Sequence, residues 1–368
     1  MNQFKAQLRT YTMVVALLAI WLIFHKYTDG AFLEPRNISN LIRQMAVTGI
    51  LAGAMVLVIV TGEIDLSVGS LCAFLGGIFA VLNTQKGIPP TEAVFLTILF
   101  GLAIGAIQGY LTAFQAVPSF IVTLGGMMGF RGASMWVTSN STIPLEENWV
   151  MQTATGYIQG ATAWALVVPL LAIASFHLFR SARLAGDPVR KLIGRLLVLN
   201  LSVLGAMAVF MSYQGLPIPV LLMALLLVVM SFLGSSTVWG RHLYATGGNK
   251  EAAFLSGVNV KFSVLSVLTL MGVLSSIGGI VLTARVGSAS PDAGQLLELD
   301  AIASCVIGGT SLAGGKGTVF GAVLGALLIE SLNNGMSLAN MEPFWQFILK
   351  GLVLVGAVWI DVASRDGK

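Results

Sequence analysis

Long apolar segments recur along this chain and decide what it can fold into. Runs of about 18 apolar residues, the length of a helix that crosses a bilayer, follow one another along the sequence. Inside lipid, backbone polar groups must be paired within the protein, which leaves helices and closed barrels as spanning structures. Hydrophobic residues make up 56% of the chain and charged residues only 10%. The sequence therefore predicts an all-α, polytopic helical membrane protein.

About twelve transmembrane helices are expected, in a single domain over residues 1–368. The first resembles a signal peptide in outline, but no small-residue cleavage site follows, so we expect a retained anchor. The expected spans are residues 11–24, 41–61, 66–82, 93–114, 119–137, 161–179, 192–211, 218–233, 262–283, 299–313, 318–332 and 344–360.

The distribution of positive charge predicts the orientation. With the N-terminus inside, thirteen of the twenty Lys and Arg residues fall in cytoplasmic segments, five in outer loops and two within spans. Cytoplasmic loops of membrane proteins carry such an excess. The pattern places both termini, the basic loop 180–195 and the loop 235–261 in the cytoplasm.

The loop 235–261 contains a polar stretch, RHLYATGGNKEAAFLSGVNVK, between two apolar runs. Gly247, Gly248 and Asn249 predict a turn, and residues 250–255 predict a short helix that Ser256 and Gly257 end. A helix held at the membrane surface can transmit motion to or from another protein. The alternative is an ordinary amphipathic loop helix.

A second polar stretch, TGEIDLSVGS, covers residues 61–70. Burying a carboxylate in lipid costs several kcal/mol, so we expect the helix to break at Glu63 and Asp65 or turn inward onto protein or water. Gly62 and Gly69 permit the break, and Asp65 can cap the next helix. In one interpretation Glu63, Asp65 and Ser67 line a gate or help hold a dimer. In the other, Asp65 and Ser67 only start a helix.

These strings resemble a known family. Glu251-Ala252-Ala253, followed after three residues by Gly257, has the spacing of the Glu-Ala-Ala loop of ABC importer permeases. Five strings resemble the ribose, galactose and xylose permeases, namely GRHLYATGGNKEAAFLSGVNV, GEIDLSVGS, PSFIVTLGG, NNG and ELDAIASCVIGGTSLAGGKGTVFGAVLGA. The branch that imports branched-chain amino acids has a different string in place of GEIDLSVGS, which favours a sugar. The resemblance assigns the ATPase-coupling loop to Gly247, Gly248, Asn249, Glu251, Ala252, Ala253, Ser256 and Gly257.

The resemblance implies a permease subunit that translocates a monosaccharide. It implies a separate cytoplasmic ATPase, a periplasmic or extracellular binding protein and a second permease copy that forms a homodimer with the first. It also implies a location in the bacterial inner membrane. ATP would be bound by the partner, with no cofactor in this chain. An extra helix hairpin at residues 161–211 resembles the xylose-type permeases and favours D-xylose. Because the hairpin is very apolar, we expect it to lie at the periphery.

Two sets of regularly spaced glycines, one of them in the C-terminal part of the chain, are interpreted as sites where helices pack closely. The run around Lys316 fails the phosphate-binding loop pattern, because Thr310 stands where the first Gly belongs and Gly317 where Ser or Thr should follow. Small residues four apart allow close helix approach in membranes. Two such sets are Gly101, Gly105 and Gly109, and Gly317, Gly321 and Gly325.

The string Glu63-Ile64-Asp65 recurs as Glu298-Leu299-Asp300, and Pro118-Ser119-Phe120 has a loose counterpart in Pro343-Phe344-Trp345. These matches align spans two to five with spans nine to twelve. By the expected orientation the two sets start on opposite sides, so they predict inverted four-helix repeats around a translocation path.

Few polar residues fall inside the expected spans, so we expect a weak, wet passage with selectivity in the binding protein. Some, such as Arg131 and Lys350, can snorkel or pair with a carboxylate such as Glu330. The gate and pathway candidates are Glu63, Asp65, Ser67, Glu298, Asp300, Asn333 and Asn334.

Two other classes of function stay open at this point. Inverted repeats and buried carboxylates suit a self-sufficient secondary transporter, which leaves the coupling helix unexplained. An integral membrane enzyme lacks support, because His25, His177 and His242 are scattered. Cys72 and Cys305 fit no metal spacing, and no metal site is expected. Which monosaccharide crosses, which residues touch it, and whether the dimer is homomeric are left open.

Overall fold

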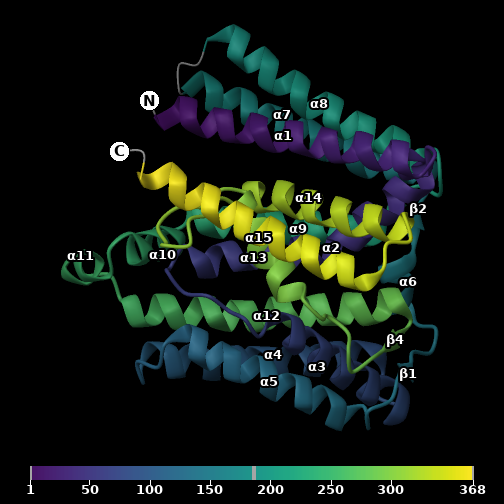
Figure 1. The fold of residues 1–368 in the computed structure, drawn as a ribbon, viewed down its shortest axis with the longest axis vertical. Helices are drawn as coiled ribbons and strands as arrows, with labels where there is room; N and C mark the ends of the chain where they lie inside the picture. The colour runs from purple at the N-terminus through teal and green to yellow at the C-terminus, as the bar shows by residue number, and fades with distance from the viewer. Residues whose placement is uncertain (1, 185–187, 367–368) are drawn as a thin grey trace.

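The computed structural model describes residues 2–184 and 188–366, which form a stack of helices lying roughly side by side (Figure 1). The long helices are α1 (Asn2–Tyr27), α2 (Pro35–Ile59), α4 (Pro90–Ala113), α5 (Ser119–Val137), α7 (Gly160–Leu184), α8 (Val189–Met211), α9 (Ile218–Ser236), α12 (Val260–Val286), α14 (Val319–Leu338) and α15 (Pro343–Asp366).

Shorter elements connect them. The short helices are η1 (Ala31–Leu33), α3 (Val68–Ala80), η2 (Val81–Gln85), α6 (Trp149–Thr155), α10 (Val238–Gly248), α11 (Lys250–Leu255) and α13 (Leu297–Ile307). Two antiparallel strand pairs join distant loops, and they are β1 (Ile143–Pro144) with β4 (Ser288–Ala289) and β2 (Tyr157–Ile158) with β3 (Leu216–Pro217).

Eight helical segments of the described residues are long and apolar enough to cross a membrane, and one of them is α3 together with η2 (Val68–Gln85). Helices α1 and α15 contain shorter apolar stretches. The polytopic helical class is therefore confirmed. The tenth expected span, residues 299–313, is wrong as a full crossing, because α13 has 11 residues. At 1.5 Å per residue it is about 16 Å long, half the thickness of the hydrocarbon core. The twelfth expected span lies within α15, whose side chains beyond Trp359 are outside the described residues.

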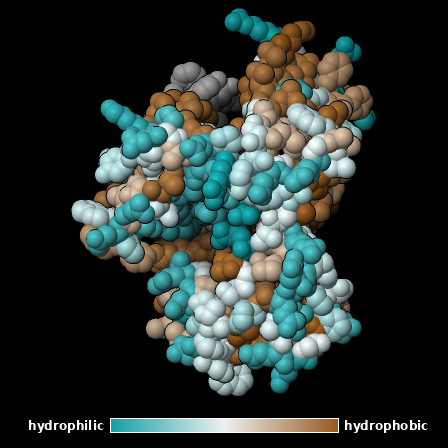
Figure 2. Space-filling model, turned by 90° about the vertical axis from the view of Figure 1, so that its right-hand side faces the viewer, coloured by the Kyte–Doolittle hydropathy of each residue, from teal (hydrophilic) through white to brown (hydrophobic). Residues whose placement is uncertain are grey.

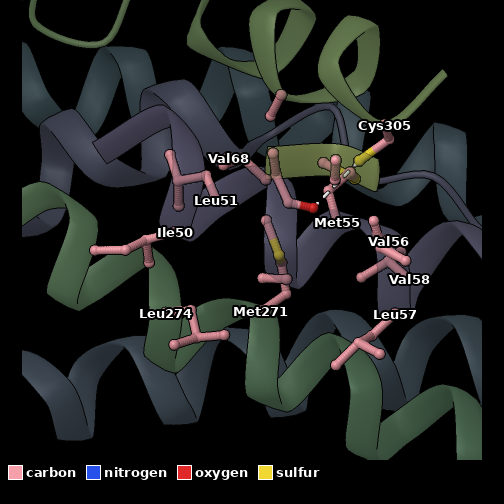
Figure 3. Packing of buried hydrophobic residues seen from close by; sticks show 14 of the residues in the cluster. Ile50, Leu51, Met55, Val56, Leu57, Val58, Val68, Met271, Leu274 and Cys305 are labelled. Carbon is pink, nitrogen blue, oxygen red and sulfur yellow. Dashed lines mark hydrogen bonds between the residues drawn. The ribbon is translucent and has the colours of Figure 1, made fainter. Parts of the chain in front are cut away.

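Helix α2 is the centre of the packing, and its segment 45–59 is buried on all sides. A helix that is apolar all round is stable only where neighbours cover every face. Here α9, α12, α13 and α14 do so. Figure 3 shows Met55 between Met271 of α12 and Cys305 of α13, whose thiol donates to the carbonyl of Ala52 at 3.2 Å.

Helices α4 and α12 approach each other through glycines. A Cβ atom at Gly105 would lie 2.5 Å from the carbonyl oxygen of Leu268, and one at Gly109 would lie 2.8 Å from that of Leu265. Gly101 faces Gly272 and Ser276 in the same way. In the second predicted set, Gly321 and Gly325 of α14 face the backbone of α13 at Gly308 and Ser304, whereas Gly317 lies in the loop before α14.

The expected hairpin consists of α7 and α8, which pack on each other and lie at one side of the bundle with α1 (Figure 1). Side chains such as Ile173, Phe176 and Val198 are about two-thirds exposed. Apolar surface of this extent suits contact with lipid. The loop between the two helices includes residues 185–187, which lie outside the described residues.

The two ends of the bundle differ. The described ends of the chain lie at the same end as α10 and α11, opposite α6 and the strands (Figure 1). Figure 2 looks onto the end with α6 and the strands, where hydrophilic residues gather at the centre and hydrophobic residues cover the upper part. This relative placement agrees with the expected topology.

Candidate functional site: a surface helix and two broken segments

Helix α11 projects from one end of the bundle, where the sequence predicted a short helix over residues 250–255. The side chain of Asn249 caps it by accepting the Ala252 amide at 2.9 Å, and Gly257 follows it with a φ of 83°. Glu251 is exposed, and Phe254 and Leu255 are 70% and 79% exposed. The helix therefore presents one acidic and two large apolar side chains outward, as a docking element does.

The turn predicted at Gly247 and Gly248 is wrong, because both residues complete α10 and only Asn249 is extended. Gly247 serves close approach instead. A Cβ there would overlap the carbonyl of Val60, at the end of α2, and lie 2.9 Å from the amide of Gly315. The Gly315 amide itself donates to Val60 O at 2.9 Å. Three segments that are far apart in sequence thus meet at Gly247.

Tyr244 fixes α10 to the same junction. Its hydroxyl donates to the carbonyl of Gly317 at 2.8 Å, and its burial raises the pKa of the phenol. A phenol that stays protonated remains a donor. α10 is therefore bound both to the end of α2 and to the loop that joins α13 to α14.

The first broken segment connects α2 to α3. Helix α2 ends at Ile59, Gly62 has a φ of 83°, and regular helix resumes only at Val68. The break predicted at this stretch is confirmed. Gly69, predicted to permit the break, lies inside α3 and serves a close contact with Gly294 instead. A side chain at Gly69 would overlap the carbonyl of Gly294, in the loop between α12 and α13.

Asp65 and Ser67 shape the start of α3. The Asp65 carboxylate accepts the Ser67 amide at 2.8 Å and the Ser67 hydroxyl at 2.6 Å, and that hydroxyl also accepts Gln108 Nε2 of α4 at 3.0 Å. The cap residue by position is Ser67, so Asp65 lies two residues before the cap and not at it as predicted. Both side chains are buried, and the helix N-terminus favours a carboxylate beside it.

The second broken segment, residues 287–296, connects α12 to α13. Gly294 lies against Gly69, and a Cβ at Gly69 would overlap the Glu298 carboxylate in the first turn of α13. The N-terminal ends of α3 and α13 therefore meet. Cys72 of α3 donates to the carbonyl of Ser275 at 3.2 Å, which sets this meeting point beside the middle of the 27-residue helix α12.

Asp300, Asn333 and Lys350 form a polar cluster among α13, α14 and α15. Asp300 Oδ2 accepts Lys350 Nζ at 3.0 Å and Asn333 Nδ2 at 3.2 Å. Beside it, Thr48 of α2 donates to Glu330. A cavity of about 340 Å³ opens at Asp300 and Lys350, with otherwise mostly apolar walls.

The seven pathway candidates thus fall in separate places. Asp65, Ser67 and Glu298 lie where α3 and α13 meet, and Asp300 lies with Asn333 in the cluster at α15. Asn334 accepts Asn37 Nδ2 at 2.9 Å, beside the start of α2. Glu63 lies apart from these candidates, and Lys250 Nζ of α11 is 2.6 Å from its carboxylate.

Helix α5 contacts both broken segments, which the sequence analysis missed. The Ile64 amide donates to Ser119 Oγ at 3.3 Å, and Thr123 Oγ1 donates to the Ile64 carbonyl at 3.3 Å. Farther along α5, Arg131 Nη1 donates to the carbonyls of Pro291 at 2.8 Å and Ala293 at 3.0 Å. Hydroxyls at Ser119 and Thr123, four residues apart on one helix face, were the available signal.

Spanning helices, a broken segment before each of α3 and α13 where these helices meet, and an exposed helix at one end are the architecture of a membrane transport permease. The family described as branched-chain amino acid transport system, permease component, matches residues 37–358. The chain belongs to this family. It is a transport subunit and not an enzyme, and it is a multi-pass protein of the inner membrane. A permease subunit of this kind works with an ATPase and a binding protein.

Relatives match the chain over nearly its whole length. The xylose transport system permease protein XylH of Escherichia coli (strain K12) is 44% identical over 97% of this chain and 93% of its own length. XylH of Haemophilus influenzae is 43% identical over 98% of each. The ribose import permease protein RbsC of Bacillus subtilis (strain 168) is 35% identical over 94% of this chain and 90% of its own. No solved structure matches the chain.

Proposed function

We propose that the chain is the permease subunit of an ATP-driven monosaccharide importer, with D-xylose as the first substrate to test. The observation that carries the substrate is identity along the chain, 44% to a xylose permease against 35% to a ribose permease. Sugar transport by ABC importers also accounts for the exposed helix α11, which a self-sufficient transporter does not need.

In this proposal α11 docks on the cytoplasmic ATPase. Glu251, Phe254 and Leu255 would enter a groove on that subunit, and the polar residues around them, including Asn249 and Ser256, hold the helix in shape. ATP binds to the partner, and this chain carries no cofactor. The excess of Lys and Arg in the loops at this end supports a cytoplasmic position for α11 and both termini.

The second subunit is proposed to be another copy of this chain that packs on α5. Gly125 and Gly129 lie four residues apart on α5, and no atom lies within 4 Å of a Cβ built on either. Small residues at this spacing let two membrane helices approach closely. Met128, between them in sequence, is 72% exposed.

Sugar passage is proposed to be weakly selective. The cavity at Asp300 and Lys350 offers few polar groups, so it fits transient contact with hydroxyls better than tight recognition. The binding protein would then choose the sugar. The carboxylates Asp65 and Glu298, where α3 and α13 meet, are candidates for the gate.

The direct test is reconstitution. The permease, purified in mild detergent from its native host, is identified with its co-purifying subunits by mass spectrometry and transferred to liposomes. We expect a stoichiometric ATPase and ATP-dependent uptake of D-xylose that exceeds uptake of D-ribose. Uptake without ATP, or the absence of an ATPase under stabilising conditions, would favour a secondary transporter. Preferred uptake of D-ribose would overturn the sugar assignment alone.

A further inference from the structure

An ion pair joins the exposed helix α11 to the first broken segment. Lys250 Nζ lies 2.6 Å from the carboxylate of Glu63, although the two residues are 187 positions apart in the chain. The Glu63 side chain is 10% exposed and the Lys250 side chain 54%. Water screens the half-exposed lysine, but its loss would leave the nearly buried carboxylate without its cation. The ion pair therefore links segment 60–67 to α11.

The residue after Glu63 is bound to α5 through both of its main-chain polar groups. The Ile64 amide and carbonyl bond to Ser119 and Thr123, each at 3.3 Å. Glu63 and Ile64 share a rigid peptide bond, so displacement of the Glu63 main chain displaces the groups that hold α5. Polar contacts thus run without a gap from α11 to the first turn of α5.

Apolar packing also joins these helices, but only indirectly. Helix α11 packs on α10 and α12, α12 packs on α3 and α4, and α5 packs on α3 and α4, whereas the polar contacts pass from α11 to α5 through segment 60–67 alone. A cavity of about 700 Å³ lies beside α11 and has Glu63, Lys250 and Glu251 in its wall. Space next to a helix permits it to shift, and the ion pair crosses the wall of that space.

We propose that Glu63 and Lys250 are positioning residues that transmit displacement of α11 to α5 during transport. The inference rests on the proposed function, in which α11 receives the motion of the ATPase. Coupling between distant sites requires a physical element that both can bias, and here that element is segment 60–67. The pair therefore sets how many sugars cross for each ATP hydrolysed.

The test is a charge exchange in the reconstituted importer with its ATPase and binding protein, with D-xylose as the probe. Lys250→Glu and Glu63→Lys are expected to lower the ratio of sugar imported to ATP hydrolysed by about tenfold, a typical size for coupling between sites. The double variant K250E/E63K restores the pair with opposite polarity and should recover most of the ratio. Lys250→Arg keeps the charge and should resemble the wild type.

A matched control is Lys261→Glu, because Lys261 lines the same cavity but places its ammonium 5.5 Å from the Phe114 ring centroid. It makes the same charge change and should leave the ratio within about twofold of wild type, less than the smallest usual coupling. The melting temperature of each purified complex reports folding separately. The link is overturned if the double variant is no better than the worse single variant, or if both single variants import normally. Failure of the wild-type complex to import counts against the proposed function, and the link falls with it.

Discussion

At the scale of single residues, close backbone contacts depend on glycine. Gly247 and Gly248 are neighbours in the last turn of α10, yet only a side chain at Gly247 would meet Val60 and Gly315. A methyl group at Gly248 would meet no atom within 4 Å. The two positions therefore separate the effect of close packing from the general effect of removing a glycine from a helix.

We predict that Gly247→Ala destabilises the protein and Gly248→Ala does not. Overpacking of a filled contact costs about 1–3 kcal/mol. At Gly248, the last residue of α10, the added methyl group meets no atom, so we expect no loss of stability. Melting of the two variants in the same detergent checks this. Equal melting temperatures would show that the contact at Gly247 is not tight.

The ion pair between Asp300 and Lys350 gives a second residue-scale prediction. Lys350→Met leaves the buried Asp300 with Asn333 alone and should cost about 3–5 kcal/mol, the usual penalty for breaking a buried pair. Adding Asp300→Asn removes the charge and should recover part of the loss. Thermal unfolding of the single and double variants measures it, and a double variant less stable than Lys350→Met would contradict the assignment.

Some of these residue roles were accessible from the sequence and others were not. Glu63 and Asp65 stood out because carboxylates are costly in a membrane, and the structure buries both. The partner of Glu63 could not be found, because Lys250 comes 187 positions later and only the fold brings them together. Asp300 and Lys350 are separated by 50 positions in the same way.

At the scale of elements, α11 carries the main functional prediction. Glu251→Arg should leave folding intact, because the side chain is exposed, and should sharply reduce ATP-driven uptake of D-xylose. Glu92→Arg, at the exposed start of α4, makes the same charge change away from α11 and serves as the control. Normal uptake by the Glu251 variant, with normal uptake by the control, would remove α11 as the docking element.

The helices that the sequence placed best are the ones with clear chemical ends. Helix α5 begins at Ser119 after Pro118 and ends at Val137, as expected. Helix α13 was misjudged because residues 308–313, GGTSLA, carry no charge to mark the end of the apolar run after Ile307. Helix α10 was not expected, since its residues are polar and its stability comes from contacts of Tyr244 and Gly247 with distant segments.

At the scale of the whole molecule, two sets of helices share one order of elements. In each set a long helix is followed by a broken segment, a short helix and two long helices, from α2 to α5 and from α12 to α15. The short helices α3 and α13 start from a common point and the second runs toward the loop that contacts α10. Element order therefore agrees with the inverted repeats expected from two short sequence matches, whereas the hairpin α7–α8 has no counterpart.

Assembly of two copies gives a prediction at this scale. Cysteine at Met128 should form a disulfide between copies in native membranes, because Gly125 and Gly129 would bring two α5 helices together. Cys72 and Cys305 are fully buried and need not be removed. Cysteine at Ile173, on the exposed face of α7, is the control and should give no dimer band. The reverse result would place the second copy on the hairpin.

The contacts of Arg131 help to keep the permease impermeable to protons. Residues 287–296 place peptide groups without helical partners within the bundle, and Arg131 binds two of their carbonyls. Such groups in a bilayer attract water unless protein covers them. Loss of Arg131 should therefore admit a chain of water molecules that conducts protons before it affects sugar delivery. Because such a leak dissipates the proton gradient, a resting current across the membrane would detect the defect first.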